Sequence, residues 1–258
     1  MTNRNPLGSA AGYGSSFPLN RSLTTRLLGF DSMDYNVVYA QMGRGKNERN
    51  VAFALAGIAG TVAKLAFDAC LYNSQNFGFI KLPDECTTGS SIMPHKKNPD
   101  VFELIRSRCN KLQALPQQIV LMMNNLPSGY FRDLQEIKEV FLPAFDQLVD
   151  CLEMTTYIVE RIRVNEHILD DSRYDLMFSV EEVNRLAAAG MPFRDAYKKV
   201  GLDIEAGKFR PEKQIHHTHE GSIGRLCNAE VAALMQQTYD RFGFDRVAAA
   251  ENRLLGRA

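Results

Sequence analysis

Residues 82–99 hold the side chains of this chain whose types and spacing are best suited to chemistry. Lys96 and Lys97 stand directly before Asn98 and Pro99, a pair that favours a helix start with asparagine as the N-cap and proline at the first helical position. The positive end of that helix would then face the two lysines, so the spot favours a carboxylate or a phosphate. A solvated basic turn that only caps the helix explains the same residues equally well. A loop this long within a helical domain is usually functional.

The string from Gly89 to Pro99 resembles the signature of the fumarase, aspartase and argininosuccinate lyase superfamily, and the signature loop spans residues 87–99. These enzymes break a C–N or C–O bond by β-elimination and release fumarate by way of a carbanion. The resemblance implies that Ser90 is the general base. Lys96 and Asn98 would supply the positive charge and the donors that a second negative charge on the substrate carboxylate requires.

A serine base needs a strongly lowered pKa, which a nearby lysine and backbone N–H groups could provide. The unperturbed pKa of His95 would suit a base as well. The family pattern leaves that position free, however, so we expect His95 to be a solvated loop residue.

Within the superfamily, the flanking segments resemble the argininosuccinate lyases. The segments that carry this likeness are Asn5–Gly8, Leu27–Phe30, Asn76–Ile80, Lys96–Asp100 and Gly190–Tyr197.

The tract from Tyr130 to Lys138 also resembles a substrate-holding segment of those lyases, Tyr-x-x-Asp-x-Gln-x-x-Lys. The resemblance implies that Tyr130, Gln135 and Lys138 bind substrate. The residues alone favour an exposed polar face at a helix start, because Asp133 and Glu136 form a capping-box pattern.

The elements that must position these residues are long helices. Apolar residues recur at alternating steps of four and three over 51–72, 102–126 and 137–162, which places each set on one stripe of a helix. Pro116 and Pro143 lie inside the second and third stripes and should kink each helix without ending it.

The sequence therefore predicts an all-α fold, with long helices of a central bundle followed by a small C-terminal helical domain. We expect the bundle domain at 1–163 and the small domain at 164–258, where shorter helical patterns are interrupted by glycines. No strand pattern is strong enough to predict a sheet.

Composition excludes several classes of function. Thirty basic and thirty acidic residues balance, which argues against a nucleic-acid binder. We expect no apolar run long enough to span a bilayer. Five cysteines without a CxxC pair fit a reducing cytoplasm. The imidazoles of His216, His217 and His219 could ligate a metal, but we favour a surface histidine run. The family reaction needs no metal or other cofactor.

The resemblance implies an argininosuccinate lyase of arginine biosynthesis that releases fumarate and L-arginine, working as a homotetramer whose active sites are shared between subunits. Two further family segments, Ser-Arg-Asn and Thr-His-Leu-Gln, do not occur in the sequence. We therefore expect this chain to be the C-terminal part of such an enzyme and inactive alone. Two alternatives stay open: a superfamily lyase acting on adenylosuccinate, aspartate or malate, and a non-catalytic structural protein of the crystallin kind.

Overall fold

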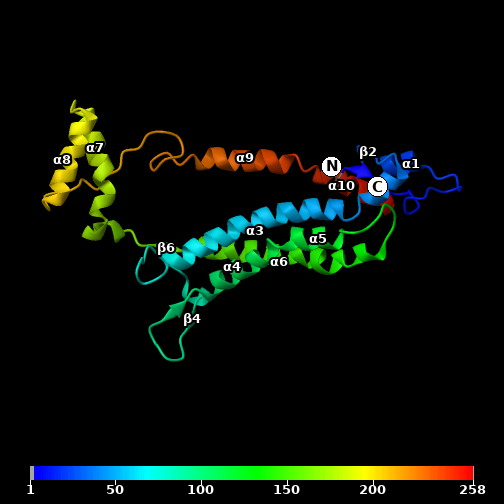
Figure 1. Ribbon diagram of the computed structural model, residues 1–258, viewed down its shortest axis with the longest axis horizontal. Coiled ribbons are helices and arrows are strands. Elements are labelled where there is room, and N and C mark those ends of the chain that lie inside the picture. The colour runs from blue at the N-terminus through cyan, green and yellow to red at the C-terminus, as the bar shows by residue number, and fades with distance from the viewer. Residues whose placement is uncertain (1–2, 258) are drawn as a thin grey trace. The chain divides into compact units, whose positions relative to one another are not determined.

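Four helices pack around one apolar core in the computed structural model, which describes residues 3–257 (Figure 1). Helix α3 (Lys46–Tyr72) packs against α4 (Asp100–Leu112), α5 (Leu115–Met122) and α6 (Ile137–Val159). The buried face of α3 consists largely of alanines, whose small side chains let the neighbouring helices approach closely. The partner helices contribute the large buried side chains, among them Phe102, Ile119 and Ile158. The prediction of an all-α bundle is confirmed.

The two prolines act differently from each other. Pro143 lies inside α6, which continues through it as predicted. The second stripe, in contrast, is divided into α4 and α5, with a break at residues 113–114 and Pro116 in the first turn of α5. Proline at 116 has no N–H to donate to the carbonyl of Leu112. The helix therefore ends and restarts here, which corrects the expectation of a single kinked helix.

Three pairs of two-residue strands accompany the helices, although the sequence suggested no sheet. Strand β1 (Arg4–Asn5) runs parallel to β2 (Ser32–Met33), β3 (Ile80–Lys81) is antiparallel to β6 (Arg163–Val164), and β4 (Thr88–Gly89) is antiparallel to β5 (Lys97–Asn98). Strands of two residues are too short to show an alternating apolar pattern.

The glycine-rich start of the chain is held in place by a buried asparagine. Asn5 is fully buried; its amide donates to Thr25 Oγ1 at 2.9 Å and its carbonyl oxygen accepts from the backbone N–H of Leu7 at 2.9 Å. Two short helices follow, α1 (Arg21–Leu27) and α2 (Val37–Met42). Both begin at an asparagine N-cap whose side chain accepts a backbone N–H, as such caps commonly do.

Residues 165–242 form a separate compact unit. It contains α7 (Ser179–Ala188), α8 (Phe193–Glu205), α9 (Asn228–Asp240) and two 3-10 segments (Ile168–Asp170 and Ser172–Phe178). Its small core is formed by Val183, Ala196, Val200 and Phe209.

The last helix, α10 (Phe244–Leu254), belongs to the first unit, which comprises residues 1–164 and 243–258. Ala250 of α10 is buried, and a Cβ placed on Gly29 would lie 3.5 Å from its Cβ. The sequence pattern grouped 164–258 as one domain. In the structure, α10 contacts α1 and β2 instead, through this small apolar contact and through an ion pair between Arg246 and Asp31.

The apolar stretch over residues 37–72 meets the length and composition of a membrane-crossing helix, which corrects the expectation that no run was long enough. A helix that forms the core of a bundle meets the same criteria. Here one face of α3 is covered by α4, α5 and α6, which accounts for the apolar residues of that face.

Candidate functional site

Ser90 lies at the point where strand β4 leaves its pairing with β5 and the chain turns. Thr88 pairs with Asn98 and Gly89 with Lys97, so the two strands form the base of a hairpin whose tip is residues 90–96. The Ser90 hydroxyl oxygen accepts two backbone N–H groups, from Ile92 at 3.2 Å and from Met93 at 3.1 Å. Donors of this kind stabilise negative charge on an oxygen.

Asn98 closes the base of the hairpin. Its side-chain amide donates to the carbonyl oxygens of Thr88, at 3.4 Å, and Gly89, at 3.5 Å. Helix α4 begins at Asp100 after Pro99, and no side chain caps it. The expectation that Asn98 is the N-cap was therefore wrong, because Asn98 is the last residue of β5 and Pro99 takes the N-cap position.

The two lysines of the signature have different roles. Lys97 forms an ion pair with Asp84, and this hydrogen bond is the main reason why the pKa of the Asp84 carboxyl lies below its ordinary value. Lys96 is exposed, and no ion pair or hydrogen bond joins its ammonium group to another residue in the 3–257 range. Its charge is therefore available to a ligand.

The tip of the hairpin is open to solvent. Ile92 is 86% exposed and Met93 41% exposed, which is unusual for large apolar side chains. His95 is exposed as well. The tip therefore carries exposed apolar surface beside Ser90.

A second group of predicted site residues lies between α5 and α6. The Gln135 amide donates to the Tyr130 hydroxyl oxygen at 3.1 Å. Residues 132–135 form a 3-10 turn and α6 begins only at Ile137, so the predicted helix start at the Asp133 capping box is corrected. Lys138 is exposed in the first turn of α6.

Arg44 joins this second group, and the sequence analysis missed it. Its guanidinium carbon lies 5.9 Å from the centre of the Tyr130 ring. The pKa of the Tyr130 hydroxyl is lowered, first by the hydrogen bond from Gln135 and then by the bond and charge of Arg44. Arg44 and Lys138 line one cavity of about 500 Å³ between α2 and α6. The sequence offers one feature that could have pointed to Arg44 as a site residue, namely its position between Gly43 and Gly45.

The hairpin and the second group lie at opposite ends of the bundle (Figure 1). The first residues of α4, next to the hairpin, pack beside the last turns of α6, around Met154 and Tyr157, whereas Lys138 lies in its first turn. At 1.5 Å per residue the 23 residues of α6 span about 34 Å. One chain therefore does not bring Ser90, Lys96 and Asn98 together with Tyr130, Gln135 and Lys138.

The histidine run contributes one well-bonded side chain. His217 lies within hydrogen-bond distance of Glu181 through Nε2, at 3.0 Å, and of Ser222 through Nδ1, at 2.7 Å. These contacts tie the segment after α8 to α7. Within the described part of the chain, no group of three or more His, Cys, Asp or Glu side chains is arranged to hold a metal ion.

Comparisons of this chain with known proteins all match it to lyases. A family model described as "Lyase" matches residues 2–114. The chain is 78% identical over 257 residues to an argininosuccinate lyase of Bacteroides thetaiotaomicron, and 74% identical over 255 residues to that of Parabacteroides distasonis. The matches cover 100% and 99% of this chain but only 58% and 57% of those relatives.

A solved structure supports the fold. The crystal structure of EDDS lyase in complex with formate superposes with a TM-score of 0.70 at 22% identity, covering 99% of this chain and 58% of that one. At this level of identity the likeness concerns the helical fold alone.

Proposed function

The chain belongs to the lyase family that contains the argininosuccinate lyases, and we propose that it supplies the general-base loop of an enzyme that cleaves argininosuccinate into fumarate and L-arginine. The observation that carries the proposal is the Ser90 hairpin, in which two backbone N–H groups point at the hydroxyl oxygen. The high identity to argininosuccinate lyases supports the choice of substrate. The reaction would serve arginine biosynthesis in the cytoplasm, where the five free thiols would stay reduced.

Ser90, as the base, takes the proton from the carbon next to a substrate carboxylate. As the proton leaves, that carboxylate gains a second negative charge. The unpaired ammonium of Lys96 and the nearby start of α4 supply positive charge where it is needed. Asn98 holds the hairpin base closed, so that Ser90 and Lys96 keep their positions relative to each other.

Tyr130, Gln135, Lys138 and Arg44 bind the substrate in this proposal. Lys138 and Arg44 give one cavity two positive charges against the single carboxylate of Glu48, which accepts the backbone N–H of Gly45; the remaining excess of positive charge suits a carboxylate of argininosuccinate. The Gln135 amide fixes the hydroxyl of Tyr130, and the Tyr130 ring lies 5.9 Å from the guanidinium carbon of Arg44, which lines this cavity.

Because the two groups lie at opposite ends of the bundle, the complete site must draw them from different copies of the chain. We infer a homotetramer with shared active sites. Exposed apolar side chains on α3, away from the buried face, supply surface for such assembly: Phe53, Ile58, Leu65 and Phe67.

The test uses a chimera in which this chain is joined to the part of the Bacteroides thetaiotaomicron relative that it does not cover. Fumarate release, followed by ultraviolet absorbance, is measured with argininosuccinate, adenylosuccinate, aspartate and malate. We expect turnover of argininosuccinate alone. Ser90→Ala should abolish turnover while substrate still binds, and the adjacent Ser91→Ala serves as the matched control.

Normal turnover of the Ser90→Ala chimera would remove Ser90 as the base. Preferred turnover of another substrate in the panel would overturn the assignment to argininosuccinate.

A further inference from the structure

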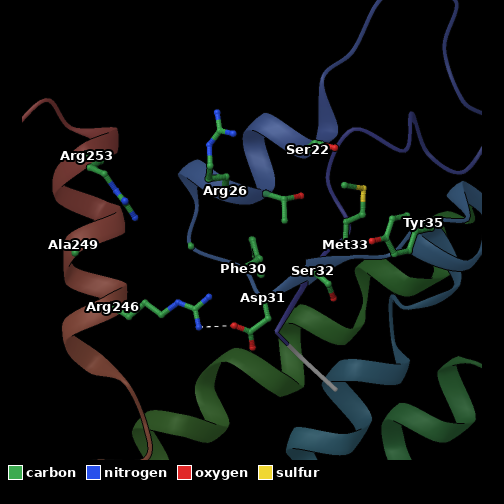
Figure 2. A pocket seen from close by; sticks show the side chains of 12 residues that line it. Ser22, Arg26, Phe30, Asp31, Ser32, Met33, Tyr35, Arg246, Ala249 and Arg253 are labelled. Carbon is green, nitrogen blue, oxygen red and sulfur yellow. Dashed lines mark hydrogen bonds and ion pairs between the residues drawn. The ribbon is translucent and has the colours of Figure 1, made fainter.

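An arginine-rich cavity lies between α1, β2 and α10, and no residue of the proposed site lines it. It has a volume of about 680 Å³, within the usual range for small-molecule sites. Figure 2 shows Arg246 and Arg253 extending from α10, with Arg26 on α1 across from them and Phe30 on the same side as Arg26. Asp31 and four hydroxyl-bearing residues complete the polar lining; the latter are Ser22, Thr25, Ser32 and Tyr35.

The spacing along α10 explains why two arginines reach the same cavity. Arg246 and Arg253 are seven residues apart, which returns them to one face of the helix, and Ala250 on that face is the buried contact with Gly29. The docking of Ala250 therefore directs both guanidinium groups towards α1 and β2.

Only one of the three arginines is neutralised. Arg246 donates to Asp31 Oδ1 at 2.5 Å, while the other carboxylate oxygen of Asp31 accepts from Asn3, also at 2.5 Å. No hydrogen bond or ion pair joins the guanidinium groups of Arg26 and Arg253 to any residue among those described. Three arginines against one aspartate leave a local excess of positive charge in a chain whose formal net charge is zero.

Each unpaired arginine stands in the last turn of its helix, where a cation is favoured by the helix dipole. The helix dipole explains why each helix ends with an arginine. It does not explain why two helices from distant parts of the sequence place their arginines around the same cavity.

We propose that this cavity binds a phosphate group, free or carried by a small molecule, between Arg26 and Arg253. The guanidinium fork matches phosphate oxygens with paired N–H donors. The Ser22 and Ser32 hydroxyls are further donors for the remaining oxygens. The cavity is larger than a phosphate ion needs, and the ring of Phe30 offers an apolar wall for the body of a phosphate ester.

The experiment measures binding by titration calorimetry with the 258-residue chain, using inorganic phosphate, AMP and adenosine as probes. Phosphate and AMP should bind while adenosine does not, and added NaCl should weaken binding because salt screens exposed charges. Arg26→Gln and Arg253→Gln should each weaken phosphate binding about tenfold or more, since hydrogen bonds to charged groups contribute strongly. The matched control is Arg194→Gln, an exposed arginine of α8, which should leave binding unchanged.

A second measurement keeps the test independent of any loss of fold in the variants. Phosphate should slow amide hydrogen exchange in α10, because a ligand held by Arg253 and Arg26 links α10 to α1. Equal affinity in all three variants would overturn the proposal, and so would binding of fumarate in place of phosphate. Failure of the lyase assay has no bearing on this result, because none of the proposed catalytic residues lines the cavity.

Discussion

The substitution Gly45→Ala tests how tightly the junction between α2 and α3 is built. Gly45 has a φ of +79°, and a Cβ at this position would lie 2.9 Å from Met123 Cγ and 3.0 Å from Met123 Sδ. With ψ at −42°, this backbone conformation lies in a sparsely populated region and costs an alanine about 1–3 kcal/mol. Overpacking against the Met123 side chain adds about 1–3 kcal/mol. We therefore expect the free energy of unfolding to fall by about 2–6 kcal/mol.

Gly78→Ala is the matched control. Gly78 also has a positive φ, +61°, but no atom lies within 4 Å of the added Cβ. Both glycines have a positive φ and share the change in unfolded-chain entropy, whereas only the alanine at 45 packs against Met123.

The assay is urea unfolding followed by far-ultraviolet circular dichroism. With a slope of about 1–3 kcal/mol per molar urea, a difference of about 2 kcal/mol separates the two midpoints by about 1 M. Equal midpoints would refute the reasoning, because they would show that the side chain of Met123 moves aside without loss of stability.

Three further outcomes follow from the pKa shifts. Arg44→Gln should raise the pKa of Tyr130 part of the way towards its ordinary value, because the hydrogen bond from Gln135 remains; phenolate absorbance, with Tyr130→Phe subtracted, measures it. The pKa of the Asp84 carboxyl is lowered, so its ion pair with Lys97 stabilises the fold above the ordinary carboxyl pKa and is lost as pH falls through the lowered value. In Lys97→Gln, the pKa of Asp84 measured by NMR should therefore rise towards its ordinary value. Burial, chiefly, raises the pKa of Cys109 to about 12, so its thiol should resist a thiol reagent at pH 8 and react after urea unfolding.

The bundle could be predicted because its helices are long and amphipathic. A stripe carried over several turns, such as that of α6 from Ile137 to Ile158, leaves no other regular structure that could bury it. The break before Pro116 could not be separated from a kink, because both outcomes follow from the same missing N–H group. The hairpin under Ser90 was missed because two-residue strands carry no periodic signal.

The residues of the candidate site could be predicted from the sequence, but their positions in the fold could not. The types and spacing of Ser90, Lys96 and Asn98 are local and can be read along the chain. Arg44 reaches Tyr130 only because α2 and α3 pack against the start of α6, and a contact of this kind leaves no mark in the local sequence. The docking of α10 on α1 depends on tertiary packing in the same way.

The contact between α10 and the start of the chain has a consequence for folding order. Arg246 and Asp31 are 215 positions apart, so closing this contact requires one of the longest loops in the molecule, and the chain entropy lost is larger than for the local contacts of the bundle. During synthesis, residues 21–33 leave the ribosome long before their partner helix exists. The arginine-lined cavity is therefore among the last features to form, and it should be among the first to open when the protein is heated.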